Sequence, residues 1–154
     1  MSTKLRAVRK EEKAQLRAML STYLAELHRY GDVEIDYPFF DSYWTDDDRW
    51  PYFIENDEKP LGFILVNTWS PSRKDTDFAV AEFYVLPDFR GAGIGKGAFA
   101  GLLKRHPGIW ELGVMTGNNA ARQFWERTIT SAEVTDIERL VREDELIYRF
   151  ATMT

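Results

Sequence analysis

The sequence predicts an α/β fold built on a mixed central sheet that is flanked by helices on both faces. Some segments carry apolar residues at helical spacing, others are short apolar runs, and the two patterns alternate along the chain. The expected order of elements is β-α-α-β-β-β-α-β-α-β-β. A hairpin lies near its centre and strand–helix–strand units follow, so the sheet combines antiparallel and parallel neighbours.

Composition places the chain among single-domain proteins. It has 154 residues, of which 44% are apolar, so we expect one domain over residues 1–154 with a substantial core. There is no cysteine, which excludes disulfides, thiolate catalysis and cysteine-bound metals. His28 and His106 are the only histidines and lie far apart in sequence, so we expect no metal site, although carboxylate sites stay open.

Charge and hydropathy narrow the class of partner. Segment 1–6 lacks the apolar run of a signal peptide, and no segment reaches the ~18 apolar residues that cross a membrane. We therefore expect a soluble, cytoplasmic protein with no membrane partner. The formal net charge of −5 argues against a nucleic-acid partner and is compatible with a cationic substrate.

A short strand and a long helix open the expected order. Residues 5–8 form the candidate strand, and residues 11–28 carry the apolar stripe of an amphipathic helix that Gly31 and Asp32 end. Residues 36–50, rich in aromatic and acidic side chains, are expected to form a loop and a short second helix. The stripe of the first helix consists of Leu16, Met19, Leu20, Tyr23, Leu24 and Leu27.

Three strands follow, at residues 52–55, 61–69 and 78–86. The polar turn 56–60 joins the first two into a hairpin. The polar loop 70–77 leads to the third strand, whose mostly apolar sequence is typical of the centre of a sheet.

The second half of the chain alternates helices and strands. Residues 94–105 form an amphipathic helix that the His-Pro-Gly sequence at 106–108 ends. Asn118 can cap a helix over residues 119–128. The remaining strands are expected at residues 109–115, 134–137 and 146–150.

Residues 85–96 combine the end of a strand, a glycine-rich turn and the start of a helix. Gly91, Gly93 and Gly95 remove side chains where the backbone turns, so several amide N–H groups can point at one spot near the positive end of a helix dipole. Arg90 and Lys96 place full positive charges beside that spot. The pattern suits a pyrophosphate, whereas a plain tight turn would need only one glycine.

Two common phosphate loops fit this turn incompletely. A Walker-type loop requires a hydroxyl residue after Lys96, where Gly97 stands, and a glycine at the position of Arg90. A dinucleotide fingerprint is met by Gly93, Gly95 and Ala98, but Glu111 lies inside the next expected strand instead of at its end. A protein that binds NAD or ATP through these glycines remains one alternative.

A third pattern, Arg/Gln-x-x-Gly-x-Gly/Ala, is met by Arg90, Gly93 and Gly95. Downstream, the sequence Asn-x-x-Ala-x-x-Phe-Trp runs from Asn118 to Trp125. Together these motifs resemble the acetyl-CoA loop and the following helix of the GNAT superfamily of N-acetyltransferases. The clear match covers about residues 81–127, and the expected element order is that of the family fold, so the sheet is expected to be GNAT-like.

The resemblance implies that acetyl-CoA, as acetyl donor, lies across the edge of the sheet where it splays apart. Its pantetheine arm would pair with the backbone of Phe83 and Val85, and an N–H near Val85 would polarise the acetyl carbonyl. Asn118 and Phe124 join the cofactor-binding set through the second motif. The pyrophosphate would accept hydrogen bonds from the N–H groups of the turn, which are those of Gly91, Ala92, Gly93, Ile94, Gly95 and Lys96.

The resemblance also implies direct attack of an amine on the thioester, for which no cysteine is needed. Glu82, an acid inside an apolar strand, is the candidate base, directly or through a water; pairing with an arginine or exposure to solvent is the alternative. Trp125 stands where many members carry a tyrosine acid, and an indole N–H is no usable acid. The leaving thiolate would then be protonated by Tyr84, by another residue or by water. Alternatively, the sulfur departs as an unprotonated thiolate.

The expected partner is an amine acceptor, either a small molecule or a peptide. In the family the acceptor groove is built near the first two helices, and residues 30–52 hold aromatics and carboxylates that suit a cationic amine. The same aromatics also suit a core or a dimer interface, and the sequence does not determine the oligomeric state. A non-catalytic acyl-CoA-binding or regulatory module on the same fold is the second alternative, favoured by Trp125.

Overall fold

The computed structural model describes residues 3–153, so Met1, Ser2 and Thr154 of the segments considered above lie outside the described residues. Its centre is a seven-stranded sheet in the order β1-β2-β3-β4-β5-β7-β6. The strands are β1 (Lys4–Ala7), β2 (Trp50–Asn56), β3 (Lys59–Asn67), β4 (Phe78–Val85), β5 (Ile109–Met115), β6 (Val134–Arg142) and β7 (Glu145–Thr152). The α-helices are α1 (Lys13–Leu27), α2 (Ser42–Thr45), α3 (Ile94–Arg105) and α4 (Asn119–Thr130), and short 3₁₀ turns lie at Lys10–Glu12 and Pro87–Phe89.

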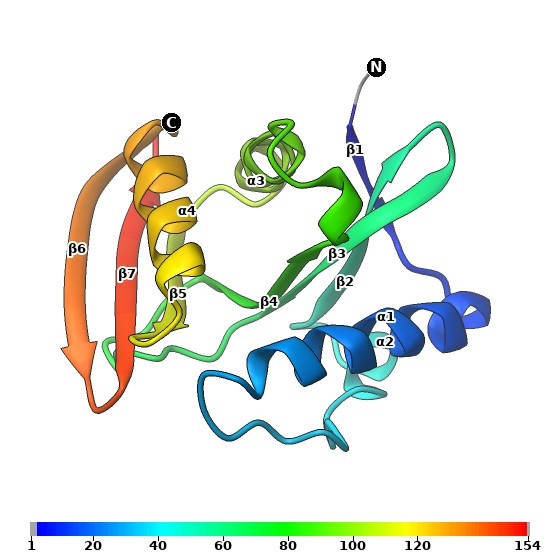
Figure 1. The fold of residues 1–154 in the computed structure, drawn as a ribbon. Coiled ribbons are helices and arrows are strands. Elements are labelled where there is room, and N and C mark those ends of the chain that lie inside the picture. The colour runs from blue at the N-terminus through cyan, green and yellow to red at the C-terminus, as the bar shows by residue number, and fades with distance from the viewer. Residues whose placement is uncertain (1–2, 154) are drawn as a thin grey trace.

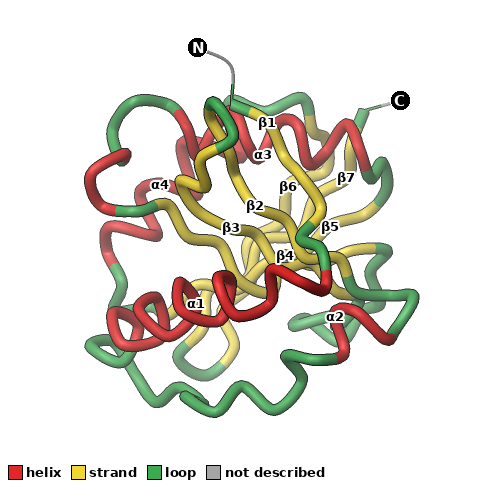
Figure 2. Tube along the Cα trace, turned by 90° about the vertical axis from the view of Figure 1, so that its right-hand side faces the viewer, coloured by secondary structure: helices red, strands yellow, loops and turns green. Residues whose placement is uncertain are grey.

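Helices cover both faces of this sheet, as the sequence predicted. Helices α1 and α2 lie on one side and α3 on the other, which Figures 1 and 2 show from two directions. One apolar cluster packs the sheet against α3 and α4, around Phe99 and Trp110. A second cluster packs it against α1, around Leu20 and Phe63. Within residues 3–153, no helix has the length and apolar character needed to cross a membrane.

The sheet is mixed because a single neighbouring pair of strands is parallel. Strands β1 to β4 pair antiparallel in chain order, and β5, β7 and β6 also pair antiparallel. The parallel pair is β4 and β5, which α3 connects. A parallel neighbour requires a crossover, and the amphipathic helix after the glycine turn provides it.

Two sequence predictions about strand length were wrong. The expected five-residue turn at 56–60 is a two-residue turn, because Asp57 and Glu58 adopt left-handed φ angles of 51° and 64° and the flanking residues pair as strand. The strand expected at 134–137 continues to Arg142. Its outer residues are polar because β6 is an edge strand, so hydrophobicity does not mark its end.

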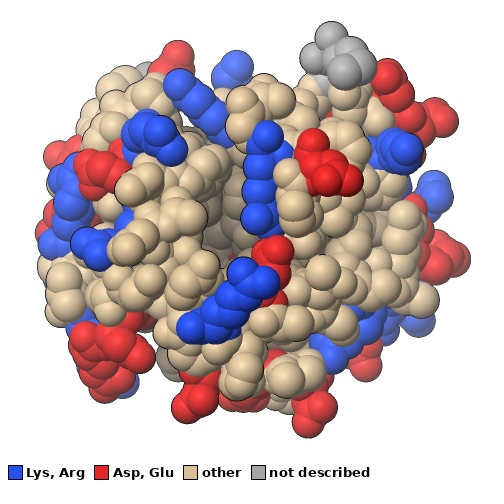
Figure 3. All heavy atoms as spheres, viewed as in Figure 1, with Lys and Arg blue, Asp and Glu red and all other residues tan. Residues whose placement is uncertain are grey.

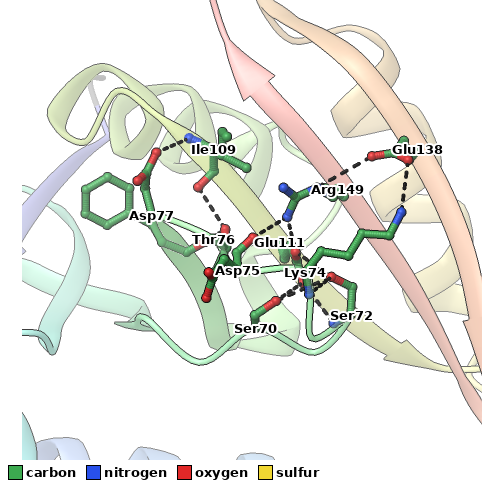
Figure 4. A network of polar contacts seen from close by, with 11 residues as sticks. Ser70, Ser72, Lys74, Asp75, Thr76, Asp77, Ile109, Glu111, Glu138 and Arg149 are labelled. Atoms are coloured by element: carbon green, nitrogen blue, oxygen red, sulfur yellow. Dashed lines mark hydrogen bonds and ion pairs between the residues drawn. The ribbon is translucent and has the colours of Figure 1, made fainter.

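The polar loop between β3 and β4 is anchored on a buried carboxylate. Glu111 on β5 is fully buried and pairs with Arg149 on β7. It also accepts hydrogen bonds from the Ser70 hydroxyl at 3.0 Å and from the Ser72 N–H and hydroxyl at 2.9 and 2.7 Å. Figure 4 shows these side chains converging beneath the strands, with Glu138 on the outer side of Arg149. The network holds the loop against the sheet directly before β4 begins.

We expect Glu111→Gln to lower the free energy of unfolding by about 3 kcal/mol, because it removes the buried counter-charge of the mostly buried Arg149 and leaves that guanidinium only the half-exposed Glu138. Glu138→Gln is the matched control. Glu138 also pairs with Arg149, at 3.5 Å, but is about half exposed, so its loss should cost less than about 1 kcal/mol. Urea denaturation of both variants measures the difference, and equal values would contradict the anchoring role.

Candidate active site

A slot opens where β4 and β5 separate. These strands pair only from Phe78 to Val80 on β4, although β4 continues to Val85 and remains paired with β3. A β-bulge at Ala81 accompanies the separation, because Leu65 pairs with Glu82 and Val66 with Val80. Bulges bend a strand and redirect its side chains. The last part of β4 therefore turns one backbone edge away from β5.

A cleft of about 620 Å³ occupies this region, between α1 on one side and α3 and α4 on the other. Figure 3 shows the corresponding hollow at the centre of the face, with basic and acidic side chains at its rim. Eleven of the sequence-predicted site residues line it; Ala92 and Glu82 do not. The eleven are Phe83, Tyr84, Val85, Arg90, Gly91, Gly93, Ile94, Gly95, Lys96, Asn118 and Phe124.

The glycine turn forms a cradle at one end of the cleft. Gly91 and Gly93 have left-handed φ angles of 83° and 79°, which glycine adopts without strain, and Gly93 is the N-cap of α3. A Cβ on Gly95 would lie 3.0 Å from the Phe124 ring. The first amides of α3 have no partner within the helix and carry the positive end of its dipole. With Lys96 beside them, these groups fit a phosphate ligand.

Arg90 has a role in the structure that the sequence did not indicate. Its Nε donates a hydrogen bond of 2.7 Å to the Val85 carbonyl, and its Nη2 lies 3.1 Å from the Glu26 carboxylate on α1. Its guanidinium also stacks over the Tyr84 ring, 5.4 Å from the centroid. Arg90 thus joins the end of β4 to α1 at the wall of the cleft, instead of extending toward the glycine turn.

The residues of the second motif occupy three different environments: a helix cap, the wall of the cleft and the core. The Asn118 side chain accepts a hydrogen bond of 3.1 Å from the Ala121 N–H and caps α4, as predicted. Phe124 lines the cleft and packs against Phe83, with 5.6 Å between ring centroids. Trp125 is buried against Phe83 and Phe99 but also touches the cleft.

Glu82 points to the α1 face of the sheet, where two phenols hold its carboxylate. The Tyr23 hydroxyl on α1 donates to Oε1 and the Tyr37 hydroxyl donates to Oε2, both at 2.9 Å. Burial raises the pKa of Glu82 to about 7, although both hydrogen bonds act in the opposite direction. A carboxyl with this pKa can take up and release a proton at neutral pH.

Tyr84 lies on the same face of β4 and is almost fully buried. Its hydroxyl has no hydrogen-bond partner among the described residues. Its ring packs against Tyr23 and Phe63 at centroid distances of 5.5 and 5.7 Å, and burial raises the pKa of its phenol. Tyr84 therefore lines the cleft, and its buried hydroxyl is protonated and unpartnered among the described residues.

The aromatic residues of segment 30–52 separate into different environments. Tyr37 reaches Glu82 from the α1–α2 loop, where its backbone has a left-handed φ of 45°. Trp50 and Tyr52 instead pack around His106 near the start of β2, which supports the core interpretation for them. Tyr43 is also in the core, whereas Phe39 is 61% exposed.

The sequence predicted an acceptor groove near the first two helices, but it identified no residue of α1 as part of the site. Tyr23 belongs to the apolar stripe, and only the polar end of its side chain distinguished it from its leucine neighbours. No grouping of three His, Asp or Glu side chains suitable for a metal ion occurs in the described part of the chain. The α1 residues that line the cleft are Tyr23, Glu26 and Leu27, followed by Arg29 and Tyr30 just beyond the helix.

Comparison with known proteins agrees with this arrangement. The profile of the acetyltransferase (GNAT) family matches residues 14–129. The fold is similar to a GNAT-family acetyltransferase from Streptococcus agalactiae 2603, with 14% identity, a TM-score of 0.72 and coverage of 99% of this chain and 96% of that one. No curated protein sequence matches the chain.

Two further solved structures carry more specific names. A ribosomal-protein-alanine N-acetyltransferase from Brucella melitensis is 16% identical, with a TM-score of 0.64 and coverage of 97% of this chain and 99% of that one. A chimera of the spermidine N-acetyltransferase SpeG from Vibrio cholerae and hSSAT is 13% identical, with a TM-score of 0.64 and coverage of 99% and 96%. At these identities the likeness concerns the fold.

We expect Gly95→Ala and Gly97→Ala to change stability in opposite directions, although both lie on α3. A Cβ at position 97 meets nothing within 4 Å, so alanine should add about 1 kcal/mol through helix propensity. A Cβ at position 95 must displace the Phe124 ring, and overpacking of about 1–3 kcal/mol should exceed that gain. Chemical denaturation measures both, and an equal gain would show that the contact with Phe124 is loose.

Proposed function

Because the chain belongs to the acetyltransferase (GNAT) family, we propose that it transfers an acetyl group from acetyl-CoA to a primary amine by direct attack on the thioester. The observation that carries the proposal is the slot between β4 and β5 with the glycine cradle at its mouth. A thioester with a phosphorylated carrier needs both parts: an unpaired strand edge for an amide-containing arm and N–H groups for phosphates.

The residues present fit coenzyme A. The cradle from Gly91 to Lys96 would hold the pyrophosphate, since its φ angles at Gly91 and Gly93 turn the backbone tightly before α3. The edge of β4 at Phe83 and Val85 would pair with the pantetheine arm, and Phe124 would form the opposite wall. The Val85 carbonyl accepts from Arg90, so this arm must pair beside that bond or replace it. Acetyl-CoA supplies the activated acetyl group.

Two side chains on β4 are proposed as catalytic. Glu82, with a pKa near 7, would accept the proton of the acceptor amine. Tyr84 would donate a proton to the leaving sulfur, because the residue lines the cleft and its buried phenol is protonated and has no hydrogen-bond partner among the described residues. Trp125 occupies the motif position of the more usual tyrosine, so the acid has to come from elsewhere.

The acceptor is proposed only as a class: a primary amine on a small molecule or a peptide. Two structures of similar fold bear names that refer to a ribosomal-protein alanine and to spermidine. Both names imply amine acceptors, and these are chemically different, so they support the reaction and leave the acceptor undetermined. A non-catalytic acyl-CoA-binding module is the competing proposal, and Trp125 favours it.

Acetyl-CoA should stabilise the native protein by about 2.7 kcal/mol at 100 times its dissociation constant, and we expect thermal unfolding to show the shift. Gly93→Asp should abolish it, because aspartate strains a left-handed position and adds negative charge to the cradle. Gly101→Asp on the far part of α3 is the control that should keep the shift. Stabilisation by NAD or ATP in preference to acetyl-CoA would instead identify a nucleotide-binding protein.

The pH dependence of acetyl transfer should report Glu82. A general base acts in its deprotonated form, so kcat/KM, calculated per neutral amine, is expected to rise with pH through about 7 and level off above it. Glu82→Gln should remove this limb and lower kcat/KM by about 100-fold or more. Rates with a panel of primary amines measure it, with Glu138→Gln as a distant control. An unchanged profile in Glu82→Gln would exclude Glu82 as the base.

A further inference from the structure

Tyr23 stands between the cleft and the candidate base. Its side chain lines the cleft, whereas Glu82 is not among the described residues that do so. The Tyr23 hydroxyl donates to Oε1 of Glu82 at 2.9 Å. Tyr23 is therefore a side chain that both lines the cleft and bonds this carboxylate oxygen.

The other carboxylate oxygen is occupied from a different direction. Tyr37, on the α1–α2 loop, donates to Oε2 at 2.9 Å and does not line the cleft. Tyr43 on α2 is close enough for the Glu82 charge to raise the pKa of its phenol, although burial is the larger cause, and the Arg49 guanidinium lies 5.5 Å from the Tyr43 ring centroid. The two hydrogen-bonded phenols have the same donor chemistry and the same distance to Glu82, and they differ in which of them reaches the cleft.

We propose that Tyr23 relays the acceptor's proton from the cleft to Glu82, an inference that rests on the proposed acetyl transfer. As the nitrogen of the neutral amine bonds to the thioester carbon, its N–H proton passes to the Tyr23 oxygen and the Tyr23 proton passes to Oε1 of Glu82. The electron pair of the N–H bond stays on nitrogen, and the pair of the C–S bond leaves with sulfur. The proton on Glu82 finally returns to the thiolate through Tyr84 or solvent, which gives an amide and a free thiol.

The surroundings of Tyr23 suit a relay. Its ring is held against Phe63 and Tyr84, each with 5.5 Å between ring centroids, so the hydroxyl keeps its direction. Burial and the nearby Glu82 charge raise the pKa of Tyr23 well above its ordinary value. The phenol therefore gives up one proton only as it receives another, as a relay requires, and does not itself become a stable base.

The pair Tyr23→Phe and Tyr37→Phe tests the relay, because each variant removes one hydroxyl and one hydrogen bond to Glu82. Both should move the pH limb of kcat/KM upward, since each removes a donor that stabilises the carboxylate. Only Tyr23→Phe should also lower kcat on the plateau, by about 100-fold, because it alone breaks the path from the cleft. The plateau value of kcat should fall much less in Tyr37→Phe.

A second measurement does not depend on how the variants fold. The wild-type kcat is measured in mixtures of H2O and D2O and plotted against the fraction of D2O. A curved plot is expected, because it indicates that two protons move in the same step, whereas a straight line would overturn the relay. Equal plateau losses in the two variants would also overturn it while leaving acetyl transfer intact. A wild-type chain that binds acetyl-CoA but acetylates no amine would overturn the proposed function and the relay together.

Discussion

The candidate site depends on how briefly β4 pairs with β5. Three register pairs, from Phe78 to Val80, join the strands, and beyond them β5 is paired only with β7. Because β4 stays paired with β3 as far as Val85, it keeps its strand conformation where it no longer pairs with β5. An unpaired edge inside a sheet is ordinarily unfavourable, since its N–H and C=O groups lack partners. Here it faces the cleft, which is walled by α1 on one side and by α3 and α4 on the other.

Two carboxylates on neighbouring strands show how surroundings assign different roles to one residue type. Glu111 is fully buried and paired with Arg149, so its charge is neutralised and it holds a loop in place. Glu82 has phenol hydroxyls as its hydrogen-bond partners, and burial raises its pKa to about 7. The ion pair makes Glu111 a structural anchor, whereas the neutral donors around Glu82 leave its carboxyl able to exchange a proton near neutral pH.

Helix α1 and the loop after it link the fold to the proposed chemistry. The leucines of α1 anchor it to the sheet, and this packing brings Tyr23 to Glu82. The loop adds Tyr37 through a left-handed backbone turn. Arg90 fastens the end of α1 to the end of β4 through Glu26. The position of Glu82, the candidate base, is thus maintained by α1, the loop after it and the end of β4.

The sequence alone determined the element order, the α3 and β5 boundaries, the glycine cradle and the cap at Asn118, because each follows from local periodicity or local backbone geometry. It also placed Glu82 and Tyr84 on the strand that forms the site. Only the tertiary structure decided that Tyr23 and Tyr37 hold Glu82, that Arg90 binds Val85 and Glu26, and that the edge strand β6 runs to Arg142. Such contacts join residues far apart in the chain, and their partners are set by packing, which no local pattern records.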